Sequence, residues 1–193
     1  MSNSMYQKII YSILLIFLIT SCSKEQIQLN IPANQEKSYE LYREAVDALK
    51  KGEYFFASKK FSEAEAILPK IQFSAKASLM SSYCLYLINF YPQAIANLER
   101  YIKTYPADKN IAYAHYLHAV SLYEQILDEE KDINPLLKSK EKIEYFLNNF
   151  PNTEYALDLN FKMDLINNQL AAKELYVAKY YITTQKWIPA TNR

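Results

Sequence analysis

A repeated pattern of a helix followed by proline limits the possible folds of this chain more than any other feature. Three times a helical pattern stops at an apolar residue followed by proline, at Leu68-Pro69, Tyr105-Pro106 and Phe150-Pro151. The spacings between these prolines are 37 and 45 residues. Proline has no backbone N–H and its ring clashes with the preceding turn, so a helix rarely continues through it. The pattern predicts an array of similar helical units from Glu36 onward.

The helix before each proline carries the same order of side-chain sizes. Positions 12, 8 and 5 before the proline hold a small residue, a large apolar residue, and a small or aromatic residue. These positions are Ala57, Phe61 and Ala64, then Ala94, Leu98 and Tyr101, then Ser139, Ile143 and Phe146. A small side chain lets two helices approach closely, and a large one fills the space between them. The pattern resembles the second helix of a tetratricopeptide repeat, whose period is ~34 residues.

A first helix precedes each of these second helices. In the first unit, Leu41, Ala45, Ala48 and Leu49 form an apolar stripe at helical spacing, which ends at Lys50-Lys51-Gly52. We expect Gly52, the single glycine of the chain, to cap this helix. So few glycines exclude glycine-loop nucleotide enzymes and most all-β folds.

We therefore predict an all-α fold, a tetratricopeptide-repeat α-solenoid of helix-turn-helix pairs spanning residues 36–193. The expected repeats lie near 36–70, 73–107 and 109–152, with an incomplete repeat at 153–193. An insertion near residues 127–134 accounts for the longer second spacing. Residues 155–184 are helical in pattern, and the sequence leaves open whether they form one helix or two.

The first 22 residues resemble a bacterial lipoprotein signal. Residues 9–19 are uncharged and apolar, but shorter than the ~20 residues that a membrane-spanning helix needs. They run into the sequence Leu-Ile-Thr-Ser-Cys, which ends at Cys22 and resembles a lipobox. The resemblance implies a signal peptide at 1–21, lipidation of Cys22 and a tether at 22–35, with Ser23 favouring the outer membrane. The alternative is an ordinary secretory signal with an incidental cysteine.

Charge and motifs argue against nucleic acid, metal and catalysis. Without residues 1–21, the chain has 21 basic and 21 acidic residues, a poor match for phosphate. His115 and His118 are the two histidines, and we expect them at the surface or in a groove rather than on a metal. Cys84 lies in an apolar stretch and reads as a buried, inert thiol. Since no catalytic or cofactor motif is present, we expect a protein that is not an enzyme and has no cofactor.

Several short stretches in order resemble one family. They are residues 112–119 (AYAHYLHA), 121–126 (SLYEQI), 150–156 (FPNTEYA), 177–181 (VAKYY) and the terminal Asn192-Arg193. Together with the lipobox they resemble the BamD family of lipoproteins, and the Tyr-Glu-Gln stretch is similar to its alphaproteobacterial branch. Family members continue for about one and a half helices more. The resemblance thus implies a C-terminally truncated chain. A final helix of about one turn is marginal on its own, so we expect either a truncated form or a last segment that is frayed or covered by a partner.

The resemblance also implies a function. BamD-like proteins are lipid-anchored at the periplasmic face of the outer membrane, in the BAM complex that inserts β-barrels. Implied partners are the barrel subunit, through its POTRA domain, and unfolded outer membrane proteins. Arg193 falls on an arginine implicated in the POTRA contact. The alternative is a periplasmic repeat adaptor for cell-wall or division machinery.

A solenoid groove, lined mainly by first helices, binds segments of other polypeptides. Aromatic side chains give such a groove large contact area at a small cost in entropy. The chain has 18 tyrosines, and we choose Tyr42 and Tyr86 as candidate partner-binding residues. The competing interpretation is that they only pack between helices.

Overall fold

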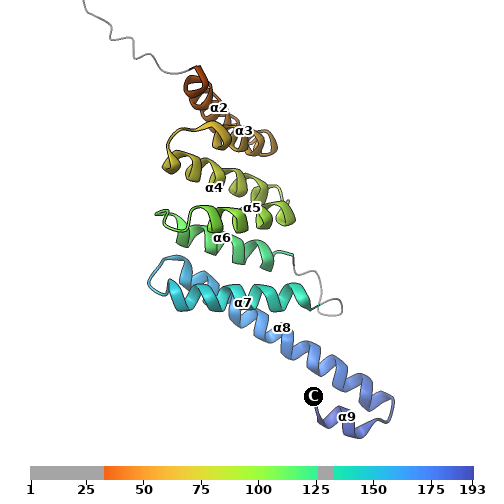
Figure 1. Ribbon diagram of the computed structural model, residues 1–193. Helices are drawn as coiled ribbons and strands as arrows, with labels where there is room; N and C mark the ends of the chain where they lie inside the picture. Colours follow the sequence, from red (N-terminus) through yellow and green to blue (C-terminus); the bar gives the residue numbers. More distant parts are fainter. Residues whose placement is uncertain (1–32, 126–132) are drawn as a thin grey trace, which may run out of the picture. The chain divides into compact units, whose positions relative to one another are not determined.

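The computed structural model describes residues 33–125 and 133–193, and side chains from Gln35 onward (Figure 1). The described residues form helices and turns without strands, which confirms the predicted all-α fold. The helices are α2 (Ala33–Lys50), α3 (Tyr54–Ile67), α4 (Ile71–Leu87), α5 (Tyr91–Thr104), α6 (Ile111–Tyr123), α7 (Asn134–Asn149), α8 (Tyr155–Thr183) and α9 (Trp187–Thr191).

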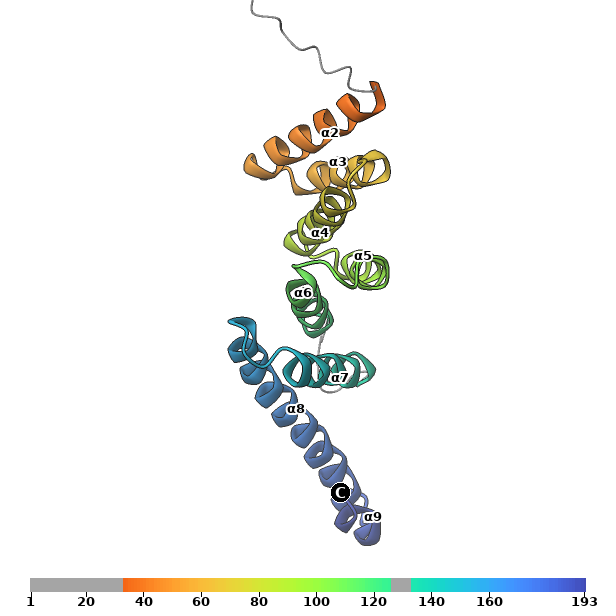
Figure 2. The same ribbon diagram turned by 60° about the vertical axis from the view of Figure 1, so that its left-hand side comes forward.

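The helices form consecutive pairs, in which α2, α4, α6 and α8 are the first helices and α3, α5, α7 and α9 the second helices. Each helix packs against the next one along the chain, as the rotated view shows (Figure 2). The first helices α4 and α6 also touch, as do α6 and α8. This neighbour-on-neighbour packing is that of a tetratricopeptide-type solenoid.

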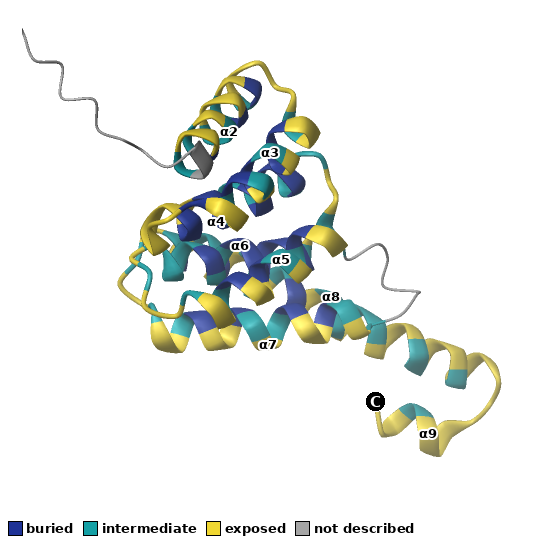
Figure 3. Ribbon diagram, turned by 45° about the horizontal axis from the view of Figure 1, so that its top comes forward, coloured by how far each residue is buried: buried dark blue, intermediate teal, exposed yellow. Residues whose placement is uncertain are grey.

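The size pattern before each proline marks the interior of the array. All nine of its positions have 0% exposed surface: Ala57, Phe61, Ala64, Ala94, Leu98, Tyr101, Ser139, Ile143 and Phe146. Figure 3 shows buried segments where helices face one another, and mostly exposed ones along the second half of α8 and in α9. The predicted core positions of the second helices are therefore confirmed.

The second helices end as the prolines predict. The residue before each proline donates its backbone N–H to the carbonyl four residues earlier, from Leu68 to Ala64 at 2.9 Å, from Tyr105 to Tyr101 at 2.8 Å, and from Phe150 to Phe146 at 2.7 Å. Each helix thus completes its last hydrogen bond before the proline ring prevents another turn.

The three turns within pairs that the structure describes in full share one capping geometry. Gly52 has φ +79°, donates to the Leu49 carbonyl, and is followed by a bond from Glu53 N–H to the Ala48 carbonyl at 2.9 Å. This is the Schellman motif, whose left-handed position suits glycine. The predicted cap at Gly52 is confirmed.

Two further turns reach the same geometry without glycine. Asn89 at φ 61° ends α4, and Gln185 at φ 58° ends α8, each with the same pair of backbone hydrogen bonds. The remaining turn, between α6 and α7, contains residues 126–132, most of the predicted insertion, which lie outside the described residues.

The last pair settles the question left open over residues 155–184. They form one helix of 29 residues, α8, and the asparagines at 167 and 168 do not interrupt it. Its buried residues Ala156, Leu159 and Ile166 all lie in the first half. Pro189 is the third residue of the five-residue α9 rather than its first.

The beginning of the described domain differs slightly from the expectation. Helix α2 begins at Ala33, three residues before the predicted start, and Cys22 lies outside the described residues. Cys84 is buried, as expected, and burial raises the pKa of its thiol to about 11. Among the described helices, none combines the length and apolar character needed to cross a membrane.

Replacing Gly52 with alanine should destabilise the protein by about 1 to 2 kcal/mol, the cost of a left-handed backbone with a Cβ. A Cβ at this position would meet nothing within 4 Å, so the cost comes from the backbone alone. Urea unfolding followed by circular dichroism measures it. The matched control is Asn89→Gly, which should change the free energy of unfolding by no more than about 0.5 kcal/mol. Equal stability of Gly52→Ala and the wild type would contradict the capping assignment.

Candidate protein-binding surface

Five tyrosines from three first helices gather into one cluster. Tyr83 and Tyr86 come from α4, Tyr113 and Tyr116 from α6, and Tyr155 from the start of α8, and we call this group the tyrosine cluster. They meet because α6 touches both α4 and α8. All five are half-buried, so each combines a packed ring with an exposed part.

The rings of Tyr113, Tyr116 and Tyr155 are in direct contact. Tyr116 stacks on Tyr155 with centroids 4.7 Å apart, and Tyr113 lies 5.5 Å from Tyr155. Tyr86 contacts Tyr91 at 5.8 Å and packs against the apolar cores of both the middle and the last helix pairs. Ring contacts of this kind add to the free energy gained by burial, and they hold the side chains in fixed positions.

Charged groups orient the hydroxyls of the cluster. The Tyr116 hydroxyl donates to Asp158 Oδ2 at 3.0 Å, and Lys162 Nζ lies 3.7 Å from Asp158 Oδ1. Lys162 also lies over the Tyr123 ring, 4.7 Å from its centroid. The surface therefore offers aromatic faces bordered by a carboxylate and an ammonium group.

Burial keeps these phenols protonated. Burial raises the pKa of Tyr113 to about 12. It also raises the pKa of Tyr116, and the hydrogen bond to Asp158 raises it further. Burial and then the Glu124 carboxylate raise the pKa of Tyr86. At neutral pH the hydroxyls of Tyr86, Tyr113 and Tyr116 are therefore neutral and both donate and accept hydrogen bonds.

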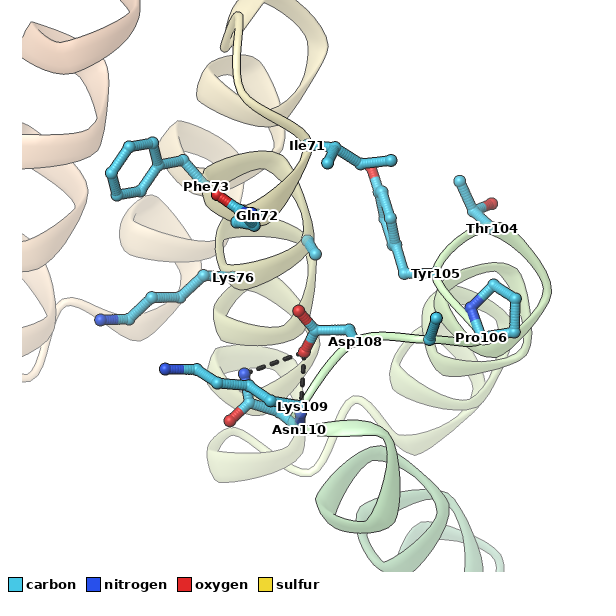
Figure 4. Close-up of a pocket in the computed structure, with 12 residues that line it drawn as sticks. Ile71, Gln72, Phe73, Lys76, Thr104, Tyr105, Pro106, Asp108, Lys109 and Asn110 are labelled. Carbon is cyan, nitrogen blue, oxygen red and sulfur yellow. Dashed lines mark hydrogen bonds between the residues drawn. The ribbon is translucent and has the colours of Figure 1, made fainter.

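A hollow lies at the start of α4, apart from the tyrosine cluster, and has a volume of about 680 Å³. Ile71, Phe73 and Tyr105 contribute apolar surface, while Lys76 and Lys109 contribute charge (Figure 4). Phe73 meets the Tyr39 ring edge-on at 6.1 Å. The hollow is large enough for several side chains of a bound polypeptide.

Asp108 organises the turn that forms one wall of this hollow. Its Oδ1 accepts a hydrogen bond from the Tyr101 hydroxyl at 2.6 Å. The same oxygen accepts hydrogen bonds from the Asn110 backbone and side-chain nitrogens at 2.8 and 3.0 Å (Figure 4). Burial by itself would raise the pKa of Asp108, but these hydrogen bonds outweigh it and lower the pKa. The turn between α5 and α6 is thereby held in one conformation.

An ion pair between α3 and α5 fixes another wall. Both terminal nitrogens of the Arg100 guanidinium, Nη1 and Nη2, donate to Glu65, at 2.6 and 2.7 Å. The Tyr105 hydroxyl donates to the same carboxylate at 3.1 Å. Arg100 also donates to Ser78 on α4 at 3.1 Å. Bidentate pairs fix orientation as well as distance. This network ties Tyr105 to three helices.

The structure does not bring the predicted site residues together. Tyr42 is half-buried on α2, where its ring meets Phe61 at 5.3 Å, in a different apolar core from the tyrosine cluster. Tyr86 belongs to the tyrosine cluster. Arg193 pairs with Glu174 at 3.3 Å, next to α9. Cys22 lies outside the described residues.

Sequence reasoning missed most of the cluster and misplaced one histidine. Tyr113 and Tyr116 lie three residues apart on one helix, a spacing that was available as a signal for a shared face.

His118 was expected at the surface or in a groove, but it is buried, because α6 is covered by both α5 and α7. Across residues 33–125 and 133–193, no group of three or more metal-ligating side chains occurs.

The helix pairs define a tetratricopeptide-type repeat protein with an aromatic surface on its first helices. The family model of the YfiO outer membrane lipoproteins matches residues 34–193, and the chain belongs to this family.

Curated relatives agree with this assignment. The chain is 36% identical over 153 residues to the outer membrane protein assembly factor BamD of Rickettsia prowazekii, covering 79% of this chain and 61% of the relative. It is 33% identical to the protein of the same name from Caulobacter vibrioides, covering 79% and 50%. For the protein of that name from Neisseria meningitidis serogroup A the identity is 26%, covering 97% and 74%. The chain thus spans about three fifths of the length of the Rickettsia prowazekii relative and half that of the Caulobacter vibrioides relative.

The raised pKa of the half-buried Tyr113 predicts that the free energy of unfolding falls in alkali. In the unfolded chain a tyrosine ionises near pH ~10, whereas folded Tyr113 ionises at about 12. The contribution of Tyr113 to stability is therefore complete below pH ~10 and is lost as the pH rises towards 12. Urea unfolding at pH 8, 10 and 11, with phenolate absorbance, should show this decline. The variant Tyr113→Phe should flatten the decline, and an unchanged slope would contradict the role of Tyr113.

Proposed function

We propose that this protein is a non-enzymatic subunit of the machinery that assembles β-barrel proteins in the outer membrane. Cys22 carries lipid and anchors the chain at the periplasmic face, and the helix pairs hold the partners. The partners are the barrel subunit, contacted through its POTRA domain, and unfolded outer membrane proteins. Family membership and the names of the relatives support the process, and the tyrosine cluster supports the binding role.

The tyrosine cluster is the observation that carries the proposal. Half-buried aromatic rings supply contact area while losing little conformational entropy, since their packing already fixes them. The neutral hydroxyls pair with backbone groups of an unfolded chain, whatever its side chains. A surface of this kind suits a protein that receives many different unfolded substrates. Tyr42, on the first helix α2 and in a separate apolar core, is proposed as a second contact.

Arg193 is the proposed contact for the POTRA domain. Its partner Glu174 is half exposed, as is Arg193 itself, and such pairs contribute only ~0 to 1 kcal/mol. A carboxylate of the barrel subunit can therefore replace Glu174 at little cost. The tyrosine cluster includes α8 only at its first residue, Tyr155, whereas the contact of Arg193 with Glu174 lies in the second half of α8. Their loss should therefore affect different partners.

The double variant Tyr86→Ser and Tyr155→Ser should bind an unfolded outer membrane protein about thirtyfold more weakly, because each interface tyrosine should contribute about 1 kcal/mol. Binding of urea-diluted barrel protein to the detergent-solubilised full chain measures this. The matched control is Phe55→Ser, which removes an exposed aromatic from α3 and should leave binding unchanged.

A second experiment tests the proposed POTRA contact with a soluble POTRA fragment. The variant Arg193→Ala should bind this fragment more weakly and should bind unfolded substrate as the wild type does. Unchanged substrate binding by a folded double variant would overturn the role of the tyrosine cluster. A pull-down from solubilised membranes that contains no barrel-assembly subunit would favour an adaptor for cell-wall or division machinery instead.

A further inference from the structure

A small pocket lies between α5, α6 and α7, and the tyrosine cluster contributes no residue to it. Its volume is about 240 Å³, and its lining is Glu99, Ile102, Lys103, His115, His118, Lys142 and Tyr145. That volume holds one side chain of a partner protein rather than a cofactor.

His118 forms the floor of this pocket and lacks a hydrogen bond. Its side chain is 4% exposed, and its Nε2 is buried without a hydrogen-bond partner among the described residues. The nearest carboxylate oxygen, Glu99 Oε1, is 3.5 Å away, beyond the range of a good hydrogen bond. Buried polar atoms are nearly always satisfied, so an unsatisfied one that faces a pocket indicates a missing partner.

The walls combine aromatic surface with positive charge. The His115 ring lies 5.0 Å from the Tyr145 ring, at an angle of 36°. Lys142 Nζ contacts Glu141 at 3.0 Å, at the surface, and Lys103 has no ion pair within the described part of the chain. Burial lowers the pKa of both histidines, and Lys142 lowers them further, although Glu99 partly offsets this for His118.

The charge of the pocket favours an anionic ligand. With neutral histidines, the lining carries two ammonium groups and one carboxylate, that of Glu99. The Glu99 side chain is 63% exposed, so it can swing into solvent without breaking any packing. A second carboxylate would balance the charge and accept a hydrogen bond from His118 Nε2–H.

We propose that this pocket binds an acidic side chain, aspartate or glutamate, from a segment of a partner protein. The carboxylate takes the place of Glu99 over His118, accepts a hydrogen bond from His118 Nε2–H, and pairs with Lys103 and Lys142. The site is independent of the tyrosine cluster, so it serves a different contact from the one proposed for unfolded substrates.

The chain contains two histidines, so selective ¹⁵N labelling of histidine gives one probe inside the pocket and one in its wall. The titrant is a blocked pentapeptide with one glutamate between two pairs of alanines, added to the full chain in detergent. We expect saturable shifts of the His118 ring signals and a raised His118 pKa. The same peptide with glutamine in place of glutamate should bind at least fivefold more weakly. Equal shifts with both peptides, or none with either, would overturn the proposal.

Two single variants test the charge argument without disturbing the core. Lys142→Met should weaken binding of the glutamate peptide two- to fivefold, which is about the size expected for a partly exposed ion pair. Glu99→Gln should strengthen it, because the competing carboxylate is gone. Weaker binding by folded Glu99→Gln, verified by circular dichroism, would show that Glu99 belongs to the ligand site itself and would refute displacement.

Discussion

Close approach between paired helices is the constraint on which the rest of this structure depends. Ala57, Ala94 and Ser139 occupy equivalent places in three second helices, and each is completely buried. A larger side chain at any of them would push two backbones apart, and the large residue four positions later would no longer fill the gap. Because each pair packs only on its neighbours, an error in one spacing would change the placement of every later pair.

The tyrosine cluster is a product of that spacing. Tyrosines 27 to 42 residues apart in sequence meet because first helices of successive pairs touch. Their hydroxyls cannot be buried without partners, and Asp158 supplies one for Tyr116. The side chains are thus oriented before any ligand arrives, which lowers the entropy cost of binding.

Much of the fold could be read from the sequence, because its signals are local. Proline ended each second helix where expected, and glycine marked the first Schellman turn. Asn89 and Gln185 make the same turn with a weaker signature, since asparagine adopts the left-handed conformation less often than glycine and glutamine does so rarely.

The site was harder to predict, because its residues are defined by distant contacts. Burial of His118 depends on α5 and α7 together, and the pair of Glu65 with Arg100 joins residues 35 positions apart. Tyr42 and Tyr86 were chosen as members of one groove, yet their rings belong to different apolar cores. Helical spacing indicates which residues share a face, but it does not show how deeply a neighbouring pair covers that face.

Helix α8 has a mechanical consequence. Its 29 residues extend roughly 44 Å at 1.5 Å per residue, yet its buried residues lie within the first half. The second half of α8 is a rigid extension of the segment that Leu159 and Ile166 hold in the core. A force on α9 would therefore be transmitted along α8 to the core that α8 shares with α6 and α7. A partner that binds the second half of α8 can thus alter the packing of its first half.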